Sequence, residues 1–375
     1  MTTVTLPLLL TGIALLAVLV ALRGVGHAVQ ASPVATQLVT IYRLVAALLV
    51  LRLISSMAAG FATAFITVAT MLIAAWLPLG GLRLVEELTR RHAPRFVKLW
   101  ALGGAIGFSL IGVTFGIVWS NAALMALALF QALTIAIMLV LIIQRRAGLP
   151  RAERATADTY LVALAATIPL ALTDFQALVP ELTLRGGVFA VLLLVLATSR
   201  LIDGGGAPRR VFADIAICLG GGGLAALGAK GDIAATGLGI ALTALALLVE
   251  RFARRRSSDG GLIHAFAMTD ASDPEALLAS HPLLVSGQII DGDALADYPA
   301  SAIAALSRYH VVSDATQDDE ARDAARDLLD AHAATHLVRL ASQPPRFLAV
   351  SAGSFAAART SDELTVLARL MERAA

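Results

Sequence analysis

Four charged side chains lie inside long apolar stretches of the sequence: Arg43, Arg52, Asp174 and Asp214. An ionisable group inside a membrane span is expensive to bury, so such residues are candidates for function. Arg43 and Arg52 share one stretch, and each lies about 9 Å of helix from one of its ends. The two side chains face opposite sides of that helix, which excludes a single site built from both.

Depth in the membrane suggests partners for these charges. Asp174 is expected at about the depth of Arg52, and Asp214 at about the depth of Arg43. We therefore predict two ion pairs, Arg52 with Asp174 and Arg43 with Asp214. Such a pair offsets the free-energy cost of a buried charge and is structural. The alternative use is a ligand-binding or proton-binding site.

Glycines occur at helix-packing intervals in another apolar stretch. Gly103, Gly107, Gly112 and Gly116 give two GxxxG spacings, which let neighbouring helices approach closely. We predict packing within the molecule, with a homodimer interface as the alternative. A second run, residues 220–223, indicates either a break in a helix or a close helix crossing.

Other residues that carry chemistry are sparse. Cys218 is the only cysteine, so neither an intrachain disulfide nor a two-cysteine metal site can form. His332 and His336 are four apart in a predicted helix and would suit one metal ion, but no third ligand accompanies them. No Walker A, GGDEF, phosphoacceptor-histidine or GxSxG motif occurs. We therefore predict no catalytic residue, no metal and no cofactor, and expect that the protein is not an enzyme.

Nine stretches approach the roughly 20 apolar residues that a helix needs to cross a bilayer. They cover residues 4–22, 37–58, 61–80, 98–119, 121–143, 158–179, 186–202, 209–229 and 232–252. The first has the alternative of a cleaved signal peptide, although no basic residue precedes it. Residues 82–97 carry apolar side chains at helical spacing among charges, which predicts a short helix lying along the membrane surface.

The arginines of the connecting segments alternate between the two sides of the membrane. They follow the first, third, fifth, seventh and ninth predicted spans, and the other loops carry almost none. Because positive loops stay in the cytoplasm, the N-terminus is predicted outside and the C-terminus inside. The preference for Ala, Leu, Gly and Arg over Lys is typical of bacteria, which suggests the bacterial inner (cytoplasmic) membrane.

The last third of the chain differs from the rest in charge. From residue 257 onward it holds 17 acidic residues and 8 arginines, whereas the preceding part is basic. We predict a membrane bundle over residues 1–256 and a cytoplasmic domain over residues 261–375. The net charge of +2 therefore does not indicate nucleic-acid binding, because the basic residues belong to the membrane loops.

Strand and helix patterns alternate within the cytoplasmic domain. Strands are expected at 283–290, 335–340 and 346–352, and helices at 299–307, 317–334 and from 361 onward. The expected fold class is a polytopic α-helical bundle of about nine spans plus a small C-terminal α/β domain.

The segment that starts at Thr335 resembles the C-terminal half of a GAF domain. In that family a strand is followed by a second strand ending in glycine, a loop, and a helix that begins Asp-Glu-Leu. The matching positions are Gly353, Asp362, Glu363 and Leu364. The resemblance implies a regulatory domain with a small-molecule pocket or a dimer surface, and no residue identifies the ligand.

The sixth and seventh predicted spans resemble the membrane sensor regions that precede a GAF domain in bacterial histidine kinases. The shared features are Asp174, Pro180 and the Gly186-Gly187 pair. Unlike those kinases, the sequence shows neither a phosphoacceptor helix nor an ATPase domain.

The expected function is that of a non-enzymatic membrane sensor or regulatory protein whose GAF-like cytoplasmic domain acts on a partner. The expected partners are the lipid bilayer and a cytoplasmic or membrane protein, such as a separate kinase, but not nucleic acid. The alternative is a membrane subunit of a transporter or polysaccharide-export system with a regulatory cytoplasmic tail.

Overall fold

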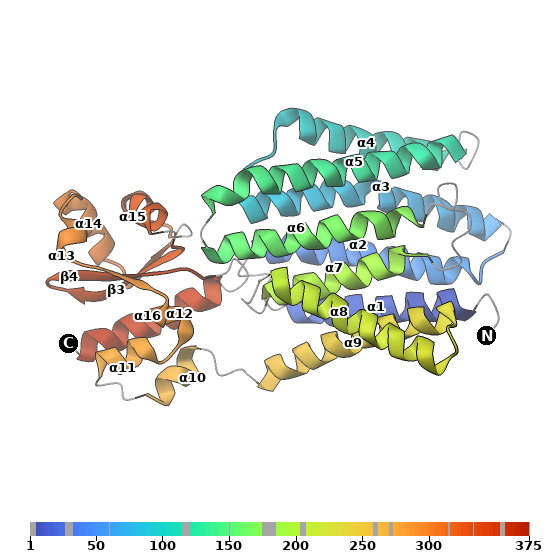
Figure 1. The fold of residues 1–375 in the computed structure, drawn as a ribbon. Coiled ribbons are helices and arrows are strands. Elements are labelled where there is room, and N and C mark those ends of the chain that lie inside the picture. Colours follow the sequence, from blue (N-terminus) through green and yellow to red (C-terminus); the bar gives the residue numbers. More distant parts are fainter. Residues whose placement is uncertain are drawn as a thin grey trace. The chain divides into compact units, whose positions relative to one another are not determined.

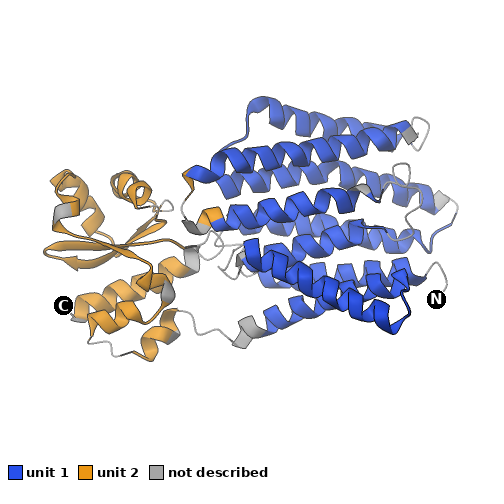
Figure 2. Cartoon of the chain, in the orientation of Figure 1, with its two compact units in different colours: residues 1–147, 155–253 blue, residues 148–154, 254–375 orange. Residues whose placement is uncertain are grey.

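The chain forms two compact units, which Figure 2 distinguishes by colour. Unit 1 comprises residues 1–147 and 155–253, and unit 2 comprises residues 148–154 and 254–375. The computed structural model describes residues 5–26, 33–59, 61–114, 121–149, 151–174, 185–202, 208–257, 262–269, 273–313, 316–332, 334–352 and 357–374.

Unit 1 is built of long helices that run alongside one another (Figure 1). Within the described residues they are α1 (Thr5–Gly26), α2 (Pro33–Ser55), α3 (Phe61–Thr89), α4 (Arg95–Val113), α5 (Asn121–Arg145), α6 (Arg151–Leu172), α7 (Gly187–Ile202), α8 (Pro208–Gly228) and α9 (Ile233–Ser257). Residues 151–154 of α6 and 254–257 of α9 belong to unit 2. A short 3-10 turn, Arg146–Gly148, follows α5.

Seven of the described helices are long and apolar enough to cross a membrane, so the chain is a multi-pass membrane protein. They are α1 to α5, α8 and α9. The other two differ for separate reasons. The first turns of α6 carry Arg151, Glu153, Arg154 and Asp158, and α7 has only 16 residues.

The helix predicted along the membrane surface at residues 82–97 does not form. Instead, α3 continues through Pro78 to Thr89, and a turn with a positive φ at Arg90 precedes α4. Leu82, Val85 and Leu88 are at most 2% exposed, because this amphipathic face packs against neighbouring helices rather than lipid. An apolar stripe suits either environment, which explains the wrong prediction.

Unit 2 contains a four-stranded antiparallel sheet in the order β1-β4-β3-β2. The strands are β1 (Gln288–Ile290), β2 (Val311–Ser313), β3 (His336–Ser342) and β4 (Pro345–Val350). The hairpin of β3 and β4 is central, and its register pairs Val338 with Leu348. The predicted strand at 283–290 is half wrong, because its first residues form the helical turn α12 (Pro282–Val285) before β1 begins.

Helices cover both faces of this sheet, as Figure 1 shows. Val338, Leu340, Leu348 and Val350 face a core shared with α10 (Leu262–Ala267), α11 (Pro274–Ala279), α12 and α16 (Ala357–Ala374). Leu337, Phe347 and Ala349 face the opposite core, shared with α13 (Gly292–Leu295), α14 (Ala300–Ser307) and α15 (Asp319–Ala331). Alternate residues of each strand therefore serve opposite cores, as the two-residue period of a strand requires.

The predicted helical spacing of His332 and His336 does not occur. Helix α15 ends at Ala331, and His336 belongs to β3. The described part of the chain contains no group of three His, Cys, Asp or Glu side chains placed to hold a metal ion.

Asp318 caps α15 and is linked to a tyrosine. The Tyr309 hydroxyl donates a hydrogen bond of 2.7 Å to Oδ2 of Asp318, while the N–H groups of Glu320 and Ala321 donate to Oδ1. The Tyr309 hydrogen bond, with the backbone bonds, lowers the pKa of Asp318 below its ordinary value. Because the folded-state pKa is lowered, the cap stabilises α15 above the ordinary aspartate pKa and loses this effect as the pH falls through the lowered value.

We expect the Tyr309→Phe variant to raise the pKa of Asp318 toward its ordinary value, because the first cause of the shift is removed. The start of α15 would then loosen at a higher pH during acid titration. NMR titration of the Glu320 and Ala321 amides in the full chain measures this midpoint. Identical midpoints in the two proteins would contradict the assigned cause.

Candidate functional site

The most deeply buried charge cluster of unit 1 joins α7, α8 and α9. Asp214 of α8 is 1% exposed. Arg200 of α7 donates to both of its carboxylate oxygens, from Nε at 3.1 Å and from Nη2 at 2.7 Å. Arg251 of α9 forms a second ion pair with Asp214 Oδ1. One carboxylate therefore binds an arginine from the helix before it and another from the helix after it.

Arg251 also contacts the last turns of α7 directly. Its Nη1 donates to Ser199 Oγ at 2.8 Å and to the Leu196 carbonyl at 3.1 Å. Its side chain is only 9% exposed. These bonds fasten α9 to α7 even apart from the shared carboxylate.

The predicted pair of Arg43 and Asp214 is wrong, because Asp214 is bound by Arg200 and Arg251 instead. Arg43 lies on an exposed face of α2. The two actual partners, Arg200 and Arg251, lie at the ends of the seventh and ninth predicted spans. The signal that identifies them is their position: each lies within a few residues of a span end on the same predicted membrane side as Asp214.

The predicted pair of Arg52 and Asp174 is present, with 3.2 Å between Arg52 Nη1 and Asp174 Oδ2. Both side chains are about one-third exposed, at 32% and 30%. The other oxygen of Asp174 accepts the N–H of Gly187 at 2.9 Å. A Cβ at Gly187 would collide with this carboxylate, so the glycine is needed for the close approach.

The two carboxylates hold opposite ends of α7. Asp174 binds the N–H of Gly187, the first residue of α7, and Asp214 binds Arg200 in its last turn. Between them, the hydroxyls of Tyr42 in α2 and Thr198 in α7 form a buried hydrogen bond. No residue between Gly187 and Arg200 is exposed, as expected for a helix that is apolar on all sides.

These contacts indicate what the cluster can do chemically. The partners of Asp214 among the described residues are arginines from the helices before and after α8. The cluster is therefore suited to holding three helices in one arrangement. No protein-family model, curated protein or solved structure matches this chain.

The predicted glycine face of α4 is not used for packing as expected. A Cβ at Gly103 or Gly107 would meet nothing within 4 Å, whereas one at Gly104 would collide with the Phe130 ring of α5. Gly112 has only an ordinary contact with Met71, at 3.7 Å, and Gly116 lies outside the described residues. The predicted spacing thus missed Gly104, which is the residue that packs closely.

The glycine run of α8 marks a close crossing and not a break, because α8 is helical throughout. A Cβ at Gly222 would lie 2.6 Å from Ile240 Cγ1 of α9. On the facing helix, a Cβ at Gly239 would lie 2.8 Å from the Gly221 carbonyl. Gly220 and Gly223 face open space. Two of the four glycines, Gly221 and Gly222, therefore let α8 and α9 touch.

Unit 2 has its own partly buried arginine cluster. Arg339 of β3 is 9% exposed. Its guanidinium donates to the Ser307 carbonyl and to His310 Nδ1, and it forms an ion pair with Glu372 near the end of α16. It therefore joins the sheet to α14 and α16.

Replacing Arg339 by lysine is expected to destabilise the end of α16 by about 1 kcal/mol, because a single ammonium cannot reproduce the planar fork of donors. Amide hydrogen exchange in the last turn of α16 measures the change in the full chain. Arg346→Lys, at an exposed position on the adjacent strand, is the matched control. Equal exchange in both variants would show that the Arg339 fork does not hold α16.

Proposed function

We propose that this protein is a non-enzymatic membrane sensor or regulator, in which the helix bundle receives a signal and unit 2 passes it to a partner. The observation that carries the proposal is the ion pair between Arg251 and Asp214. Arg251 belongs to α9, the helix whose last residues lead into unit 2. A change at α7 or α8 therefore acts directly on the helix that is connected to the output domain.

In this proposal α7 is the element that responds. Its N-terminal end is held by Asp174 and its C-terminal end is linked to Asp214. A signal that alters the packing of α7 changes the geometry of Arg200, and Arg251 then competes differently for the shared carboxylate. Two packings of α9 that differ by a few kcal/mol would suffice for signalling.

The proposal extends to topology and to the domain family. We place the protein in the bacterial inner membrane, with α6 and α7 among nine spans, the N-terminus outside and unit 2 in the cytoplasm. The alternation of loop arginines supports this placement. We propose that unit 2 is a GAF-like regulatory module, supported by the succession of β3, β4 and α16. Gly353 of the GAF-like pattern lies outside the described residues.

A partner is best sought at β1, which is an edge strand of the sheet. Unpaired backbone groups at a sheet edge favour association with another chain. Ile289 on this strand is 43% exposed. It is therefore a suitable position for a photo-crosslinking amino acid in the full-length protein.

The test captures partners through Ile289 in membranes of the source cells and compares the parent chain with Asp214→Asn. We expect a signalling protein, such as a kinase, to be captured by the parent and in altered yield by Asp214→Asn. Arg209→Gln, an exposed arginine of α8, is the matched control and should leave the yield unchanged. Capture of transporter or polysaccharide-export subunits would favour the alternative function, against which the unbroken α8 counts. An unchanged yield in Asp214→Asn would contradict coupling through α9.

A further inference from the structure

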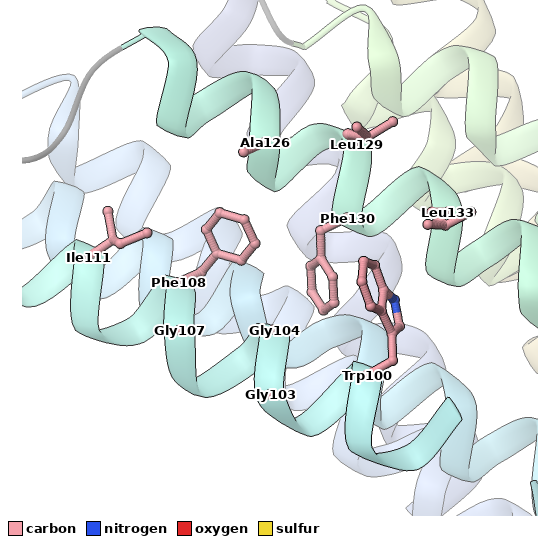
Figure 3. Close-up of a pocket in the computed structure, with 10 residues that line it drawn as sticks. All are labelled: Trp100, Gly103, Gly104, Gly107, Phe108, Ile111, Ala126, Leu129, Phe130 and Leu133. Atoms are coloured by element: carbon pink, nitrogen blue, oxygen red, sulfur yellow. The ribbon is translucent and has the colours of Figure 1, made fainter. Parts of the chain in front are cut away.

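An apolar groove of about 460 Å³ lies between α4 and α5. Figure 3 shows Trp100, Phe108 and Phe130 beside it, with Leu129 and Leu133 along the α5 side. Every lining residue is apolar or glycine except for the indole nitrogen of Trp100. That nitrogen is occupied, since it donates to Thr134 Oγ1 at 3.1 Å. The volume lies within the range of about 300–1,000 Å³ that small-molecule sites occupy.

The groove exists because two glycines of α4 leave it unfilled. Gly103 and Gly107 have nothing within 4 Å of the place where a Cβ would be. The Phe130 ring forms one side of the groove and packs closely on Gly104. The centroid of this ring lies 5.7 Å from that of Trp100 and 5.5 Å from that of Phe108. The groove is therefore a concave apolar surface with closely packed aromatic rings on one side.

The length of the groove matches one leaflet of a bilayer. It extends along α4 from Trp100 to Ile111, which is about 16 Å at the helical rise. Half of the roughly 30 Å hydrocarbon layer is about 15 Å. Trp100 marks the shallow end, because tryptophan prefers the level of the lipid headgroups.

Exposed arginines lie just beyond this shallow end. The turn between α3 and α4 and the first residue of α4 carry Arg90, Arg91 and Arg95, all exposed. The nearby carboxylate of Glu86 is bound to Lys98 at 2.7 Å. Among the described residues, Arg91 and Arg95 have no carboxylate partner. Basic groups at the end of an apolar groove suit an anionic headgroup above a hydrocarbon chain.

We propose that this groove binds one acyl chain of an anionic glycerophospholipid, whose phosphate is held by Arg91 and Arg95. The occupant is a lipid of the surrounding bilayer rather than a helix of a second copy. The positive charge of the turn between α3 and α4 selects an anionic headgroup, and the apolar groove holds the acyl chain. The site is separate from the Asp214 cluster and does not depend on the signalling proposal.

The test uses full-length protein in nanodiscs and two photoreactive probes, phosphatidylglycerol and phosphatidylcholine, each with a diazirine on the same acyl chain. Peptide mapping locates the label. We expect phosphatidylglycerol to label α4 and α5 more strongly than phosphatidylcholine does. Gly107→Leu should reduce this label to the phosphatidylcholine level, because leucine fills the groove. Gly220→Leu is the matched control, since Gly220 also faces open space on α8.

The arginines are tested separately. Arg91→Gln and Arg95→Gln should each lower the preference for phosphatidylglycerol by about fivefold, the effect of one basic residue near an anionic surface. Arg209→Gln should not change it. Equal labelling by both probes in the parent chain would overturn the proposal, as would undiminished labelling of Gly107→Leu or cross-links of α4 to a second copy. If Gly107→Leu does not fold, Gly103→Leu blocks the same groove.

Discussion

The Asp214→Asn variant is expected to lose about 3–5 kcal/mol of unfolding free energy, the usual effect of breaking a buried ion pair. The loss is large because asparagine leaves two arginines facing each other without a counter-ion, one of them only 9% exposed. Arg251→Leu should have a smaller effect, since Arg200 still pairs with the carboxylate. Asp214→Asn is therefore expected to lose more unfolding free energy than Arg251→Leu.

Detergent-solubilised protein titrated with a denaturing detergent provides the measurement, with helix content as the signal. Arg209→Gln removes an exposed charge from the same helix and should keep the parent midpoint. The double variant Asp214→Leu with Arg251→Leu should recover part of the loss, because only Arg200, at 26% exposed, is left to reach solvent. Equal midpoints for Asp214→Asn and Arg209→Gln would show that the cluster does not hold the bundle.

The Gly239→Leu variant should force α8 and α9 apart and lower stability by about 3 kcal/mol, the upper part of the range for overpacking. A Cβ there would lie 2.8 Å from a backbone carbonyl and 2.7 Å from Ala225 Cβ. Backbone atoms cannot turn aside as a side chain can, so the helices themselves must move.

Gly223→Leu is the matched control for this substitution. It places the same side chain on the facing helix, where no atom lies within 4 Å, and leucine favours helix more than glycine does. We expect its unfolding midpoint to equal or exceed that of the parent. Equal unfolding midpoints for Gly239→Leu and Gly223→Leu would show that α8 and α9 do not pack closely at Gly239.

Apolar length was enough to predict where most helices of unit 1 lie, because a bilayer demands about 20 apolar residues for each span. It was not enough to assign residues 82–97, because an amphipathic stripe packs equally well on lipid or on another helix. In unit 2, residues 283–290 form a short apolar run that suits both strand and helix, and only tertiary contacts decide between them.

For the charge pairs, the depth of each residue in its span can be read from the sequence, whereas the contacts between helices cannot. Depth alone suggested Asp174 for Arg52, and the structure contains that pair. Depth could not choose among several arginines on one membrane side for Asp214, since it carries no information on which helices touch. The choice of Arg200 and Arg251 follows from the neighbours of α8.

The two carboxylates also differ in when their partners are synthesised. Arg52 and Asp174 are 122 residues apart, whereas Arg200 and Asp214 are 14 apart. At about 5–20 residues per second, Asp174 is made roughly 6–24 s after Arg52. Until then Arg52, in the last turn of α2, can extend its side chain to the membrane surface. Asp214 is the more deeply buried of the two acids, and it is synthesised only 14 residues after Arg200. A counter-ion for this carboxylate is therefore already present in the chain when Asp214 enters the membrane.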